Sequence, residues 1–216
     1  MVRHAAGNTT AIDDAGPAAG AEGNARLTSI TGLALLVMLA VEGYTILDVQ
    51  GLITLHIFLG TMLVAPVLLK SGSTIYRFSR YYAGAEPYVR KGPPHPILRV
   101  IGPLVIISSL LVLGSGLGLL AVPAGQAGFL LTVHKASFIV WVALMTIHVL
   151  GHLRGAAIDG WREVTPRRND PAARRRSARL VIIVLVLLVG AGAAAVVLPS
   201  ASGWTNRTKI GHDSRR

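Results

Sequence analysis

Five long apolar stretches alternate with polar segments along the chain. Each stretch holds about twenty residues, which is enough for an α-helix to cross the roughly 30 Å hydrocarbon core of a bilayer. Strands of a membrane barrel would instead alternate apolar and polar positions over short segments, and the chain lacks that pattern. The sequence therefore predicts an all-α integral membrane fold. The expected spans are residues 27–47, 51–69, 97–122, 129–152 and 180–198.

The composition agrees with this prediction. Hydrophobic residues make up 52% of the chain, charged residues only 14%, and the mean hydropathy is +0.56. A soluble domain carries about a quarter charged residues. The net charge of +11 would suit a nucleic-acid partner, but nearly all basic residues lie between the spans, where membrane topology alone explains them. The expected partner is the lipid bilayer, with no nucleic acid.

The basic residues also predict the orientation of the chain. Segments 70–99 and 153–179 carry the positive charge, whereas 48–51 and 123–128 carry none. Basic loops stay in the cytoplasm, so we expect a multi-pass protein of the plasma membrane, with its N-terminus inside and its C-terminus outside. The expected units are a disordered cytoplasmic tail (1–26), a four-helix bundle (27–155), a basic cytoplasmic linker (156–179), a fifth transmembrane helix (180–199) and an extracytoplasmic tail (200–216).

Histidines within the apolar spans are the candidate functional residues, because an imidazole in a membrane core usually faces the bundle interior with a partner. His134 and His148 lie on one face of the fourth span, about 21 Å apart along its axis. His56 lies about five residues below the outer end of the second span, and His134 lies equally far below the outer end of its own. Two histidines at one depth on different helices can supply both axial ligands of a haem iron. Gly60, one turn from His56, leaves room for a macrocycle or for a close helix approach.

A second haem near the inner face stays open at this point. His148 lies at the right depth to bind it, and its partner could be His95 before the third span or His152 one turn further along the fourth. Arg99 could pair with haem propionates, or it could simply mark the inner end of its helix. For each histidine taken alone, the alternative is a polar side chain bonded to a neighbouring carbonyl or hydroxyl group.

Two further observations bear on which redox cofactor the chain can bind and on how protons could accompany electrons. The chain has no cysteine, which excludes cysteine-ligated iron–sulfur clusters and covalent CxxCH haem attachment, so any haem must be bound non-covalently. Glu42 near the outer end of the first span could accept a proton when a haem or quinone is reduced. The alternative for Glu42 is a carboxylate near the membrane interface that reaches water.

The pattern of His56 followed by His134 and His148 resembles the membrane cytochrome b subunits of the cytochrome b561 and formate dehydrogenase gamma type, across residues 27–155. The resemblance implies a four-helix transmembrane bundle that binds two b haems, one near each face. It implies His56 and His134 as ligands of the outer haem iron and His148 as one ligand of the inner iron. The family's remaining inner ligand commonly lies at the cytoplasmic start of the first helix, where this chain has Arg26, Leu27 and Thr28.

The expected function is that of a haem b membrane subunit of a redox complex. Such a subunit carries electrons between a partner oxidoreductase, for example one containing molybdenum or flavin, and the quinone pool, or across the membrane. No catalytic nucleophile or acid–base pair is evident, which predicts an electron-transfer subunit rather than a self-sufficient enzyme. The alternative is a haem-free membrane anchor or transporter component that uses its intramembrane histidines for helix packing or proton passage.

Overall fold

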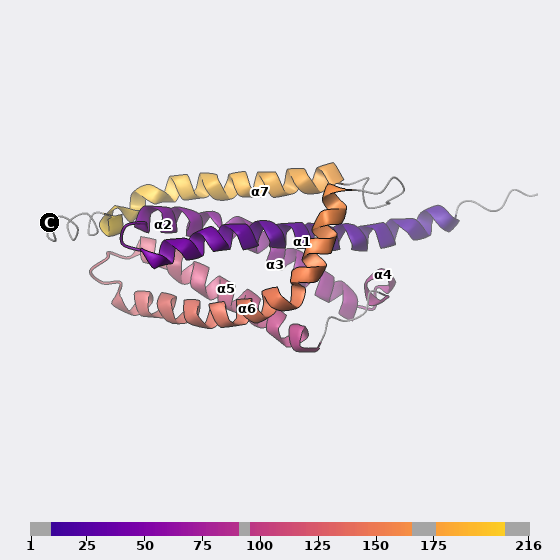
Figure 1. The fold of residues 1–216 in the computed structure, drawn as a ribbon, viewed down its shortest axis with the longest axis horizontal. Helices are drawn as coiled ribbons and strands as arrows, with labels where there is room; N and C mark the ends of the chain where they lie inside the picture. Colours follow the sequence, from indigo (N-terminus) through magenta and orange to yellow (C-terminus); the bar gives the residue numbers. More distant parts are fainter. Residues whose placement is uncertain (1–9, 91–95, 166–175, 206–216) are drawn as a thin grey trace, which may run out of the picture.

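The fold is a bundle of long helices that run along one common direction (Figure 1). The structure, a computed structural model, describes residues 10–90, 96–165 and 176–205, and within these ranges it contains helices and no strand. Five segments are long and apolar enough to cross a membrane, which confirms the predicted all-α, five-span architecture. The helices are α1 (Thr10–Leu47), α2 (Ile53–Met62), α3 (Val64–Tyr82), α4 (Glu86–Val89), α5 (Pro96–Ala121), α6 (Gly128–Val164) and α7 (Arg176–Val197), followed by the 3-10 turn η2 (Leu198–Ala201).

The first helix is longer than the sequence predicted. α1 begins at Thr10, so the expectation of a disordered tail is wrong for residues 10–26, while residues 1–9 lie outside the described part of the chain. This segment is rich in alanine, the residue with the highest helix propensity. Ala21 and Ala25 are buried against neighbouring helices, so tertiary packing also stabilises the added turns.

The second span consists of two helices separated by the single residue Leu63. Pro66 has no backbone N–H, so the carbonyl oxygen of Met62 loses its usual helical donor. Leu63 itself keeps helical dihedral angles and its N–H donates to the carbonyl oxygen of Leu59. The span therefore continues across the break as one transmembrane segment, Ile53–Tyr82.

α7 packs against this break. A Cβ atom on Gly190 would collide with the carbonyl oxygen of Met62, so the absence of a side chain allows α7 to approach the α2 backbone directly. Beyond α7, the Trp204 indole Nε1 donates to the carbonyl oxygen of Leu119 on α5 over 3.0 Å. The fifth span is thus fixed to the bundle at two places.

α6 also departs from expectation, because it continues as a helix to Val164 instead of ending at residue 152. Its carboxyl-terminal part bends away from α5 and crosses α1 (Figure 1). At this crossing, Ser29 Oγ donates to Asp159 Oδ2 over 3.1 Å, and Leu33 packs directly against Gly160. The first part of the expected basic linker is therefore an ordered helix that contacts α1.

The segment expected as a loop from residue 70 to 96 is largely helical as well. α3 continues to Tyr82 and the short α4 follows it, so Lys70, Arg77 and Arg80 of this segment lie on a helix. Near the start of α5, Arg99 Nη2 donates to the Tyr82 hydroxyl over 2.6 Å, and the guanidinium group lies 5.6 Å from the centre of that ring. Arg99 is therefore bound by an aromatic side chain at this end of the bundle.

The close contact at Gly190 gives a testable prediction. We expect Gly190→Ala to lower the stability of the protein in detergent by about 1–3 kcal/mol, because the added methyl group collides with the Met62 carbonyl. Gly192→Ala is the matched control, since a Cβ atom there meets nothing within 4 Å. Thermal unfolding of both variants measures the difference, and equal melting temperatures would contradict this packing.

Candidate functional site

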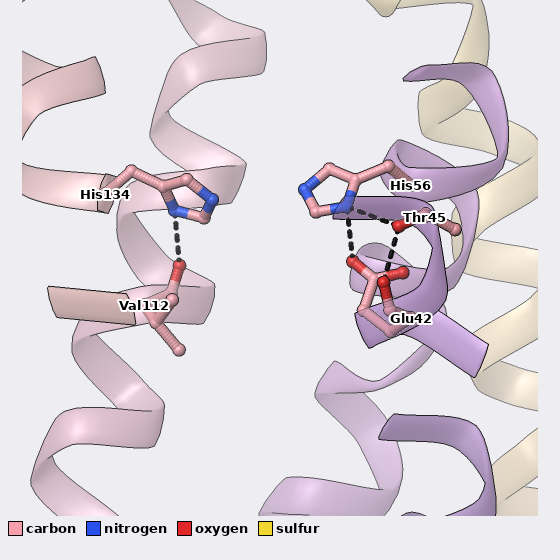
Figure 2. A network of polar contacts seen from close by, with 5 residues as sticks. All are labelled: Glu42, Thr45, His56, Val112 and His134. Atoms are coloured by element: carbon pink, nitrogen blue, oxygen red, sulfur yellow. Dashed lines mark hydrogen bonds and ion pairs between the residues drawn. The ribbon is translucent and has the colours of Figure 1, made fainter. Parts of the chain in front are cut away.

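Two histidines from separate helices face each other inside the bundle. His56 on α2 and His134 on α6 have ring centroids 6.4 Å apart, with ring planes at 78° to one another. In Figure 2 each ring directs one nitrogen toward the other histidine and its second nitrogen toward polar groups on a neighbouring helix. The depth match inferred from the sequence therefore corresponds to direct proximity in space.

The His56 ring is held by two groups of α1. Its Nδ1 lies 2.9 Å from Glu42 Oε1 and 2.9 Å from Thr45 Oγ1. The Thr45 hydroxyl donates its proton to the backbone carbonyl oxygen of Glu42, so toward His56 it can only accept, and an ionised carboxylate also only accepts. Both contacts therefore require a proton on Nδ1. In the neutral ring, Nε2 is then the unprotonated nitrogen that faces His134.

The His134 ring is held in the same manner by α5. Its Nδ1 lies 3.0 Å from the carbonyl oxygen of Val112 and 3.1 Å from Ser115 Oγ. A carbonyl oxygen has no proton to donate, so Nδ1 carries the proton here too, and the Ser115 hydroxyl donates to the same carbonyl. A Cβ atom on Gly116 would lie 3.2 Å from His134 Cε1, so this glycine lets the ring lie against α5.

The result is a pair of Nε2 lone pairs directed at each other, an arrangement that suits a Lewis acid between them. A histidine nitrogen lies about 2.0–2.1 Å from a bound transition metal, and about 1.1 Å from the centre of a ring built from bonds of roughly 1.33 Å. Two nitrogens on opposite sides of one metal therefore place the ring centroids about 6.4 Å apart when the three atoms are collinear. The observed separation of 6.4 Å fits this geometry.

The donor set fits haem iron in particular. A macrocycle supplies four equatorial ligands, so the protein has to provide only two axial nitrogens. The described residues contain no group of three or more ligating side chains around one point that could hold a bare metal ion. In addition, α2 and α6 do not pack extensively against each other in the described part of the chain.

Glu42 and Gly60 have roles that differ from the simplest expectations. The Glu42 side chain is only 13% exposed, so it points into the bundle toward His56 instead of reaching water. A Cβ atom on Gly60 would lie 3.3 Å from Glu42 Oε1. The space at Gly60 is therefore taken by the carboxylate, and this glycine serves the close approach of α1 to α2.

At the opposite end of the bundle the described residues form no comparable pair. His148 and His152 lie on the same helix one turn apart, with ring centroids separated by 4.7 Å. Two rings on one helix cannot approach a macrocycle from its two faces. His148 Nδ1 is buried without a hydrogen-bond partner, and Lys70 of α3 lies close enough to act electrostatically on both rings. Lys70 itself donates to the carbonyl oxygen of Thr28 over 3.1 Å.

The other residues considered for the inner site do not complete it. Arg99 is bound to Tyr82, and His95 lies outside the described residues. Around the start of the first predicted span, Thr28 and Ser73 are joined through their hydroxyl groups, 3.0 Å apart. Within the described ranges, this end of the bundle thus offers His148 no facing histidine.

Comparison of the chain with protein-family models, curated proteins and solved structures found no match. The resemblance to membrane cytochrome b subunits therefore stays a prediction.

Three groups of the site were missed at the sequence level: the hydroxyls of Thr45 and Ser115 and the carbonyl of Val112. Each hydroxyl lies on a helix next to a histidine-bearing helix and bonds the backbone carbonyl three residues earlier. Hydroxyl residues at the depth of the two histidines were the available signal. Depth alone does not tell which of several serines and threonines contact the rings, because that depends on the rotation of each helix.

Trp141 fixes the register of α6 against α5 about two turns from His134. Its indole Nε1 donates to Ser109 Oγ over 2.9 Å. We expect Ser109→Ala to lower the stability by about 1–3 kcal/mol, because the indole N–H is then left without an acceptor. Ser108→Ala is the matched control, since Ser108 is equally buried and only donates to its own helix. Thermal unfolding compares the two, and a Ser108→Ala loss as large as that of Ser109→Ala would contradict the assigned role.

Proposed function

We propose that this chain is a haem b membrane subunit of a redox complex, in which His56 and His134 would bind the iron of a haem near the outer face. The observation that carries this proposal is the pair of facing imidazoles, 6.4 Å apart between centroids, each with its Nδ1 engaged by an acceptor group. Ligating histidines almost always donate their second N–H to a carboxylate or a backbone carbonyl, which fixes the tautomer and the ring orientation. The His56 ring donates to the carboxylate of Glu42, and the His134 ring donates to the backbone carbonyl of Val112.

Hydroxyl groups next to the two histidines determine which ring nitrogen carries the proton. Thr45 and Ser115 each direct their hydroxyl proton to a backbone carbonyl and present a lone pair to a ring N–H. Both Nε2 atoms are thereby kept unprotonated without any other base. The apolar helices around the two rings supply a low dielectric. Haem, when bound, supplies the one-electron chemistry.

The partners and the orientation belong to the same proposal. We infer that electrons pass between a partner oxidoreductase, of the molybdenum or flavin class, and the membrane quinone pool, or across the plasma membrane. The basic segments would face the cytoplasm and the site at His56 would lie toward the outside. The alternative, a haem-free anchor or transporter component, is separated from this proposal by the experiment below.

A reduced-minus-oxidised absorption spectrum of the purified protein tests the proposal. The wild-type protein should show the bands of a low-spin b-type haem. His56→Ala and His134→Ala should each remove at least half of the haem absorbance, because each deletes one axial ligand of one site among at most two.

His148→Ala is the matched control, since it removes an intramembrane histidine on the same helix as His134 but outside the facing pair. It should keep the outer-site absorbance. A wild-type protein without a b-type signal would overturn the cytochrome proposal in favour of the haem-free alternative. Full haem content in His56→Ala would show that the facing pair is not the ligand pair.

The space at Gly116 provides a test that leaves the ligands unchanged. Gly116→Leu should reduce haem content several-fold, because its side chain must displace the His134 ring, which lies 3.2 Å from the position of the added Cβ. Gly114→Leu places the same side chain two residues away on α5, where a Cβ meets nothing within 4 Å, and should keep wild-type haem content. The ratio of haem to protein measures the effect, and equal ratios for the two variants would contradict it.

A further inference from the structure

The two ligand histidines differ in one respect that bears on electron affinity. Both donate from Nδ1 to a hydroxyl and to a second oxygen, at closely similar distances. For His134 the second oxygen is the neutral backbone carbonyl of Val112. For His56 it is the carboxylate of Glu42, 2.9 Å away. A hydrogen bond to an ionised acceptor is about twice as strong as one to a neutral acceptor, so His56 is the ligand with the greater anionic character.

From this asymmetry we propose that Glu42 is a positioning residue that lowers the reduction potential of the haem held by His56 and His134. The inference rests on the proposed haem site and adds a determinant of its electron affinity. The carboxylate does not touch the iron. It acts through the His56 ring, whose N–H it accepts, and hydrogen bonding by such outer partners raises the basicity of the ligand.

The surroundings of Glu42 strengthen this effect. Its side chain is only 13% exposed, and its Oε1 accepts the hydrogen bond from His56 Nδ1. The second oxygen, Oε2, is buried without a hydrogen-bond partner in the described part of the chain. A carboxylate in such a place interacts strongly with nearby charge, because little water screens it. Oxidised iron carries one positive charge more than reduced iron, so Glu42 stabilises the oxidised form and disfavours entry of the electron.

Gly60 of α2 leaves space for the Glu42 carboxylate. Oε1 lies 3.3 Å from the position that a Cβ atom of Gly60 would occupy, so any larger residue there would crowd the carboxylate. The hydroxyl of Thr45, which is fully buried, is the second acceptor of the Nδ1 N–H. Residues of α1 and α2 therefore fix the carboxylate in its contact with the ring.

Glu42→Gln tests the proposal, because glutamine keeps the shape and an oxygen that accepts from Nδ1 while the negative charge is removed. In a redox titration of the purified haem protein at constant pH, the midpoint potential of Glu42→Gln should rise. We expect at least a tenfold shift of the reduction equilibrium, which for a one-electron couple is about 59 mV. The electron comes from the chemical reductant of the titration.

Asp48→Asn is the matched control. Asp48 is an exposed carboxylate in the turn that follows α1, at the same end of the bundle, where it accepts from the Gly51 N–H over 3.0 Å. This variant removes one negative charge without touching His56, so its potential should change by less than half of the Glu42→Gln shift. An equal shift in both variants would indicate a general charge effect and overturn the specific role of Glu42.

The remaining outcomes are also decisive. A Glu42→Gln potential equal to or below that of the wild type overturns the inference while the haem site stands, whereas a wild type without haem overturns the proposed function itself. If Glu42→Gln cannot be isolated with haem, Glu42→Asp decides. It keeps the charge but withdraws the carboxylate by one methylene, so the potential should rise by a smaller amount, and an unchanged potential overturns the inference.

Discussion

Placing an imidazole among apolar helices imposes one requirement from which the arrangement of the bundle follows. The ring N–H needs an acceptor, because a bilayer core offers no water to supply one. In this protein the acceptors come from neighbouring helices: α1 serves the ring on α2, and α5 serves the ring on α6. Each histidine therefore fixes two helices in depth and in rotation. Four spans are brought into register around the point where the rings meet.

Small residues allow this register to be reached. Helices in lipid gain no hydrophobic free energy from packing against one another, so close contact depends on removing side chains from the interfaces. Gly60 admits the carboxylate and Gly116 admits a ring, while Gly190 brings α7 against a carbonyl oxygen that Pro66 has left without its helical donor. A proline and a glycine on different spans thus act together. Pro66 causes the break between α2 and α3, and α7 packs against this break through Gly190.

The sequence predicted the fold well where the hydrophobic pattern was long, and less well at the ends of helices. The five spans were evident from run length, but α1, α3 and α6 all extend further than predicted. Their added turns contain polar and charged residues such as Asn24, Arg77 and Asp159, which carry no hydropathy signal. Their helicity comes from propensity and from tertiary contacts, for example that of Ser29 with Asp159, which a hydropathy profile cannot detect.

At the candidate site the sequence supplied the depth of each histidine but not its rotation. Counting residues from the outer helix ends was sufficient to match His56 with His134. The partners of the rings depend on helix rotation, and a change of one residue in phase would have directed Glu42 toward lipid. The same limit applies at the other end of the bundle, where depth suggested partners for His148 and the described structure places none opposite it.

The crossing of α6 over α1 has a consequence for assembly during synthesis. Ser29 and Asp159 are separated by 130 positions in the sequence, so the contact between them forms only after four spans have left the ribosome. Until then, the first helix has no partner along this part of its surface. The crossing therefore forms late, and it joins α1 to α6 only after the spans between them have been made.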